Sequence, residues 1–83
     1  MSDAANFEIW KQFQEKRSNH LLTVMNYAEW DKGLDPIGAS DMLTDLARFT
    51  YNMMHENVFL PPEETWEQFT QSDAWKQYGL NNF

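Results

Sequence analysis

Carboxylates are the reactive side chains that this sequence groups most closely. The close groups are Asp31 with Asp35, Asp41 with Asp45, and Glu63 and Glu64 with Glu67. Paired carboxylates do acid–base chemistry only in a dry cleft that separates their pKa values. Asp41, Glu63 and Glu64 instead stand where helices are expected to begin, and helix starts favour negative charge. Asp45 has Arg48 one turn further along the same helix. The pattern therefore indicates helix capping and a solvated acidic surface, not a catalytic dyad.

The remaining side chains form no constellation that could bind a metal or attack a substrate. His20 and His55 are far apart in the sequence, and the chain has no Cys. A zinc site needs three or four ligands at supportive spacing. Three glycines are too few for a nucleotide-binding loop, and no serine lies in a nucleophile motif. We expect no catalytic, metal or cofactor site, and no enzymatic activity.

Aromatic side chains are unusually frequent, with four Trp, three Tyr and six Phe in 83 residues. This is more than a domain of three or four helices has to bury, so some are expected at the surface. Aromatic and Met residues are enriched in protein interfaces. Phe59, Trp75 and Tyr78 are the candidate contacts. In the alternative interpretation, all the aromatic residues serve core packing or a self-dimer.

Negative charge is concentrated in the later part of the chain. Residues 1–28 are neutral, whereas residues 29–83 hold ten acids and three bases and account for the net charge of −7. Such a surface repels nucleic acid phosphates and anionic membranes, and it attracts a basic protein patch. The candidate contact carboxylates are Asp41, Asp45, Glu56, Glu63, Glu64, Glu67 and Asp73.

The chain length and the absence of certain segments indicate one small domain. Eighty-three residues make a single domain over 1–83, with little room for a pocket beside a core. No apolar run approaches the ~20 residues that span a bilayer, and the first residues do not resemble a signal peptide. Because no disulfide is possible, we expect a reducing cytoplasm.

Helical periodicity predicts an all-α fold of three to five helices in an orthogonal or irregular bundle. The expected helices span residues 4–17, 19–32, 41–56, 62–70 and 73–78. Ser18 or Asn19 is expected to begin a second helix after a kink, although one long helix remains an alternative. Gly33 is expected to end that helix, Ser40 to cap the next, and Pro62 to open the fourth. Gly79 is expected to end the last helix.

The first 32 residues carry an apolar face at three- and four-residue steps. Its members are Phe7, Trp10, Phe13 or Gln14, Arg17, Leu21, Val24 or Met25, and Ala28.

These observations predict an acidic protein-binding module. It would act as an adaptor or inhibitor by covering a basic surface of a partner protein, without binding nucleic acid or membrane itself. A sharper version is a nucleic-acid mimic, such as a phage- or plasmid-encoded antagonist, in which carboxylates replace phosphates. The alternative is a structural homo-oligomer, with a homodimer as the simplest case, or a small subunit of a larger assembly.

Overall fold

The computed structural model describes residues 3–78, with side chains from residue 6 onward. Within this range the chain is all-α, which confirms the predicted fold class. The elements are α1 (Asp3–Asn26), a π-helical turn η1 (Tyr27–Asp31), α2 (Ser40–His55), α3 (Pro62–Thr70) and α4 (Asp73–Lys76). Gly79, the expected end of the last helix, lies outside the described residues.

Helix α1 is one continuous helix, so the predicted break near Ser18 and Asn19 is wrong. Both residues lie in the middle of the helix. The Asn19 carbonyl accepts a hydrogen bond from the Thr23 hydroxyl at 2.8 Å, a bond typical of a helix interior. A cap residue begins a helix only where the preceding residues leave the helical conformation, and here they do not.

Gly33 ends the first helical segment as predicted. It has a positive φ of 71°, a conformation that glycine adopts without the steric cost of a Cβ. The Leu34 N–H donates to the Ala28 carbonyl at 3.1 Å, a bond one residue longer than the long hydrogen bond of a glycine-terminated helix because the last turn is π-helical. The chain therefore reverses direction at Gly33 and brings Leu34 into the core, where it is buried.

Helix α2 supplies the most regular buried face. Leu43, Leu46, Thr50 and Met54 recur at helical spacing and are all buried. Ser40 is the first helical residue and not the cap that the sequence predicted, since Ala39 precedes the helix without a side-chain cap. The turn before it is held instead by the Asp35 carboxylate, which accepts the backbone N–H groups of residues 37 and 38.

The two C-terminal helices are short. Pro62 begins α3 in the first turn, as predicted. The Thr65 hydroxyl donates to the Leu60 carbonyl at 3.2 Å and ties the helix to the preceding loop. Helix α4 is a single turn, shorter than the expected 73–78, because residues 77 and 78 form a turn.

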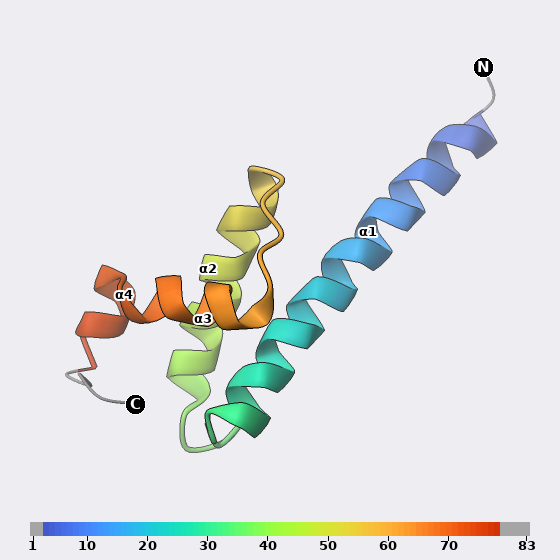
Figure 1. The fold of residues 1–83 in the computed structure, drawn as a ribbon. Coiled ribbons are helices and arrows are strands. Elements are labelled where there is room, and N and C mark those ends of the chain that lie inside the picture. Colours follow the sequence, from blue (N-terminus) through green and yellow to red (C-terminus); the bar gives the residue numbers. More distant parts are fainter. Residues whose placement is uncertain (1–2, 79–83) are drawn as a thin grey trace.

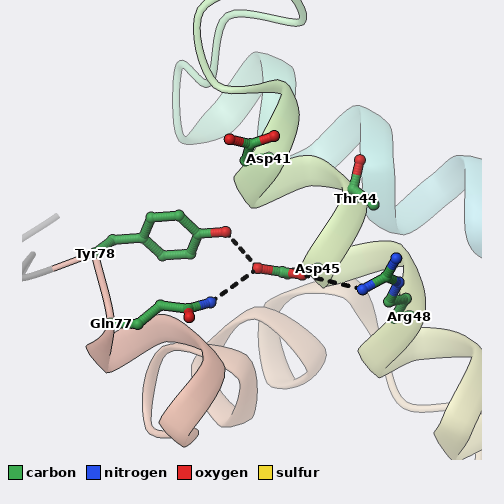
Figure 2. A pocket seen from close by; sticks show the side chains of 6 residues that line it. All are labelled: Asp41, Thr44, Asp45, Arg48, Gln77 and Tyr78. Carbon is green, nitrogen blue, oxygen red and sulfur yellow. Dashed lines mark hydrogen bonds and ion pairs between the residues drawn. The ribbon is translucent and has the colours of Figure 1, made fainter.

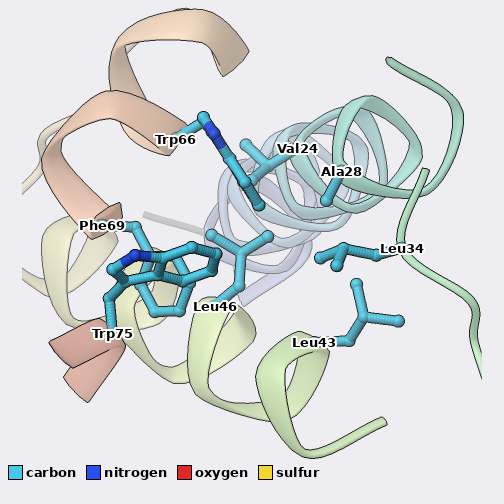
Figure 3. Packing of buried hydrophobic residues seen from close by; sticks show 8 residues of the cluster. All are labelled: Val24, Ala28, Leu34, Leu43, Leu46, Trp66, Phe69 and Trp75. Carbon is cyan, nitrogen blue, oxygen red and sulfur yellow. The ribbon is translucent and has the colours of Figure 1, made fainter. Parts of the chain in front are cut away.

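The core lies where the C-terminal half of α1 meets α2, α3 and α4 (Figure 3). Its buried members are Val24, Ala28, Leu34, Leu43, Leu46, Trp66, Phe69 and Trp75. Ring centroids of Trp66 and Trp75 are 5.4 Å apart, and those of Phe69 and Trp75 are 5.6 Å apart. Such edge-on packing adds about 0.5–1.5 kcal/mol per pair to the burial itself.

The N-terminal half of α1 projects away from this core (Figure 1). The molecule measures 53 × 22 × 19 Å, and the long dimension follows α1. Every described residue from 6 to 13 is exposed. We call residues 3–17 the arm and residues 18–78 the body.

Candidate functional site

Most of the predicted contact carboxylates lie on the surface of the body. Six of them are exposed, and Asp45 is half-buried. The exposed residues are Asp41 on α2, Glu56 directly after it, Glu63, Glu64 and Glu67 on α3, and Asp73 on α4. Asp73 lies 3.9 Å from Lys76 on the same helix, an exposed pair that contributes little to stability.

Asp41 and Asp45 line an open depression of about 430 Å³ between α2 and the C-terminal turn (Figure 2). The other lining residues are Thr44, Arg48, Gln77 and Tyr78. The Asp45 carboxylate accepts hydrogen bonds from the Tyr78 hydroxyl and, at 3.2 Å, from the Gln77 side-chain amide. Arg48 Nη1 lies 4.0 Å from the same carboxylate, as the spacing predicted.

The depression is rich in hydrogen-bond acceptors. Asp41 has an exposed carboxylate and Thr44 an exposed hydroxyl, although that hydroxyl donates to the Ser40 carbonyl at 2.9 Å. Carboxylates of this kind hold a Lys or Arg side chain through charge-assisted hydrogen bonds. The depression therefore offers two carboxylates to a basic side chain of a partner. That of Asp41 is free, and that of Asp45 already accepts hydrogen bonds from Gln77 and Tyr78.

Tyr78 is the most strongly shifted acid of this site. The hydrogen bond to Asp45 raises the pKa of Tyr78 to about 12, with smaller contributions from burial and from the negative charges of Asp45 and Asp41. The neutral phenol donates to the carboxylate, whereas a phenolate would be repelled by it. Tyr78 therefore stays neutral at physiological pH and connects the C-terminal turn to α2.

This shift gives a prediction for alkaline pH. A raised pKa in the folded state stabilises the fold below the ordinary value of 10.0, and this contribution disappears as the pH rises from 10 to about 12. We expect ultraviolet titration of the wild type to contain one tyrosine ionising near pH 12, and that step to be missing in Tyr78→Phe. Tyr51→Phe, which changes an exposed tyrosine, should leave the step in place. If both variants keep it, the bond to Asp45 does not form.

Phe59 is only half-buried, but another part of the chain covers its ring. The ring packs edge-on against His20 at 5.1 Å, and Lys16 Nζ lies 4.3 Å from its centroid. Burial first, and then the charge of Lys16, lower the pKa of His20 below its ordinary value. Phe59 thus packs the loop before α3 against α1, and less of it is available to a partner than the sequence suggested.

Trp75 is a core residue, so its predicted role at the surface is wrong. Only 3% of the side chain is exposed, and it packs against Trp66 and Phe69. Trp75 was a candidate because the chain has more aromatic residues than a small core has to bury. The turn at residues 71 and 72 folds α4 back onto α3 and buries it.

Sequence reasoning missed the aromatic residues that are exposed, most of all those of the arm. Phe7 and Trp10 are each 57% exposed and Phe13 is 38% exposed. All three belong to the apolar face predicted for the first 32 residues, for which no covering element was predicted. A usable signal was present, because this face is longer than the short helices available to cover it.

A second group of exposed apolar side chains lies near the chain reversal. Trp30 is 82% exposed and Ile37 is 88% exposed. Trp30 lines an open depression of about 280 Å³ with Glu29, Leu34 and Pro36. No pattern of residues singled out this group, since Trp30 lies within the expected helix and Ile37 lies in a loop.

Residues 6–78, whose side chains the structure describes, contain no group of three or more His, Asp or Glu side chains that could hold a metal ion. Among the helices of the same range, none combines the length and the hydropathy that crossing a membrane requires. The comparisons with known proteins matched the chain to no family model, no curated protein and no solved structure.

Proposed function

We propose that the chain is a small protein-binding module, an adaptor or inhibitor whose acidic body covers a basic surface of a partner protein. The observation that carries this proposal is the exposure of six carboxylates on α2, α3, α4 and the turn after α2. Exposed carboxylates without a matching number of cations create a negative field, which speeds association with a positively charged partner.

The separation of charge along the molecule supports the same function. Residues 29–78 hold ten acids and three bases. The described part of the arm, residues 6–17, holds Glu8 and Glu15 against Lys11, Lys16 and Arg17. The negative field therefore comes from the body, and a basic partner would approach α2–α4 in preference to the arm.

A more specific form of the proposal is mimicry of nucleic acid. In this form the carboxylates of the body occupy a groove in which a nucleic-acid-binding protein normally holds phosphates, as an antagonist of phage or plasmid origin would do in a reducing cytoplasm. Duplex DNA carries one charge per ~1.7 Å of axis, so the partner's own nucleic acid should compete with the chain for binding.

Charge reversal on α3 tests the proposal. Glu63, Glu64 and Glu67 are exposed, so Lys at these positions alters the surface without entering the core. In a pulldown from cell lysate, we expect the wild type to retain a basic protein at low salt and to release it at high salt. With the purified partner, we expect the triple variant to bind about tenfold or more weakly, because like charges then face each other. We expect the melting temperature to fall much less, since charge at a helix start contributes only about 0.3–1 kcal/mol per residue.

A second triple variant controls for net charge. Glu8, Glu15 and Asp31 are also exposed but lie outside α2–α4, and their reversal changes the net charge of the chain by the same amount. We expect this variant to bind nearly as well as the wild type. If reversal of Glu63, Glu64 and Glu67 leaves binding intact, or if both triple variants weaken it equally, the acidic face of α3 is not the contact.

A structural homo-oligomer is the second candidate function. The observation that favours it is the exposure of the aromatic residues on the arm, which nothing in the described chain covers. The two functions make separate predictions, since partner binding through the body depends on salt and on α3, whereas self-association depends on the arm and on protein concentration.

A further inference from the structure

The aromatic side chains of the arm form one stripe. At about 100° per residue, Phe7, Trp10 and Phe13 fall on the same side of α1. The rings of Phe7 and Trp10 are 5.8 Å apart. Their exposed fractions of 38–57% are far above those of core residues. We call Phe7, Trp10, Phe13 and the adjoining Asn6, Gln14 and Arg17 the aromatic stripe.

This stripe continues the face that α1 buries in the core. The steps 7, 10, 14, 17, 21, 24 and 28 alternate by three and four residues, the repeat by which a helix packs along a partner helix. Val24 and Ala28 are fully buried against the body, whereas the first two positions are exposed. Helices α2–α4 cover only the C-terminal end of the seam (Figure 1). The N-terminal end has the same spacing, but no helix packs against it in residues 3–78.

The residue types of the stripe are arranged symmetrically about Trp10. Phe7 and Phe13 lie three residues to either side, and Asn6 and Gln14 lie four residues to either side. Seven residues to either side are Asp3 and Arg17. We propose that the stripe is a two-fold interface, in which the arms of two copies of this chain pack antiparallel with Trp10 on the axis.

Antiparallel packing of this kind pairs each stripe residue with a matching partner. Trp10 meets its own copy, Phe7 meets Phe13, and the two amide side chains meet each other. A two-fold interface requires such self-complementarity, because each contact occurs twice with the roles exchanged. A parallel arrangement would instead place Arg17 opposite Arg17, and like charges facing each other are unfavourable.

Arg17 is positioned for this contact. Its guanidinium lies over the Phe13 ring, 4.4 Å from the centroid, and its Nε is buried without a hydrogen-bond partner in the described chain. Arg17 forms no ion pair within residues 6–78. The antiparallel register brings residue 3 of the second copy to the level of Arg17, so Arg17 lies at the edge of the paired arms.

The geometry of the arm leaves room for the second copy. The paired residues 3–17 overlap over roughly 22 Å at 1.5 Å per residue, and the two bodies lie at opposite ends of the paired arms. An interface of one helix per copy is small compared with stable dimers. We therefore expect an equilibrium that depends on concentration in the micromolar range, and the acidic body of each copy stays uncovered.

Sedimentation equilibrium of the full chain provides the first test. We expect the weight-average mass of the wild type to rise from 9.9 kDa toward twice that value as concentration increases through the micromolar range. We expect Trp10→Glu to raise the dissociation constant at least about tenfold, since two carboxylates then meet on the axis. Gln12→Glu is the control, because Gln12 is exposed on the same arm but lies about 160° from Trp10, on the opposite face of the helix.

Cysteine variants test the register, since the chain has no cysteine of its own. In the antiparallel register Asn6 of one copy lies opposite Gln14 of the other. We expect a mixture of Asn6→Cys and Gln14→Cys to form a disulfide-linked dimer under mild oxidation, in higher yield than either variant alone. A wild type that stays monomeric overturns the proposal, as does equal association by Trp10→Glu. Preferred linkage within each single variant indicates parallel arms and also overturns it.

Discussion

Leu46→Ala is expected to remove most of the free energy of unfolding of the protein at room temperature. Leu46 is fully buried on α2, at the centre of the cluster that joins α1, α2 and α3. Removal of a buried leucine side chain costs about 2–5 kcal/mol, because transfer free energy is lost and a cavity remains. A core of this size rarely supplies more than roughly 3–5 kcal/mol in total. One substitution therefore removes most of the stability.

Leu22→Ala is the matched control for this experiment. Leu22 is 59% exposed on α1, so the same chemical change removes little buried surface, and alanine favours the helix slightly more. We expect a shift within about 0.5 kcal/mol. Urea denaturation followed by circular dichroism gives both values. One fixed, low protein concentration is needed, because self-association would stabilise the folded state. Equal effects of the two substitutions would contradict the core described for this fold.

Local signals in the sequence predicted the helices well where the chain must change direction. Gly33 and Pro62 each have a backbone constraint that acts within one turn, and both end or begin a helix as expected. The buried positions of α2 follow from spacing alone, since Leu43, Leu46 and Thr50 fall on one side of any helix. These features depend on neighbours in the sequence and on no other part of the fold.

The predicted break at Ser18 and Asn19 shows where local signals mislead. Both residue types favour helix starts, because their side chains can accept backbone N–H groups. The apolar repeat nevertheless continues through Leu21, Val24 and Ala28, and packing of Val24 and Ala28 against the body keeps the residues after Asn19 helical. Tertiary packing contributes more to a helix than one capping preference does.

Burial of the aromatic residues could not be predicted from composition. The sequence showed that some aromatic side chains exceed what the core can hold, but not which ones. Which aromatic residues are buried depends on how far α2–α4 reach along α1, and they reach only its C-terminal half (Figure 1). Phe7 and Trp10 are therefore exposed, whereas Trp75, near the end of the chain, is buried.

Trp75→Ala is expected to destabilise the domain by about 3–5 kcal/mol, in spite of its place near the C-terminal end. Trp75 is 3% exposed and is the buried residue of α4. Loss of the ring removes the contacts with Trp66 and Phe69 and releases the turn that holds Tyr78 against Asp45. Because this loss is as large as the whole stability expected of the domain, we expect amide hydrogen exchange to become fast throughout the body and not only over residues 71–78. Trp75→Phe, which keeps an aromatic ring, should lose less stability than Trp75→Ala.

Trp30→Ala is the same chemical change at an exposed position, and we expect it to cost almost no stability. Trp30 is 82% exposed, so little buried surface is lost, and we expect a shift within about 0.5 kcal/mol. If Trp75→Ala instead left stability unchanged and weakened partner binding, the residue would be a surface contact, and the packing of α4 against α3 would be wrong. Weaker partner binding in proportion to lost stability would show that α4 acts by holding Tyr78 and Asp45 in place. The pair of tryptophan substitutions therefore separates a residue that holds the acidic surface together from one that only lies on the outside.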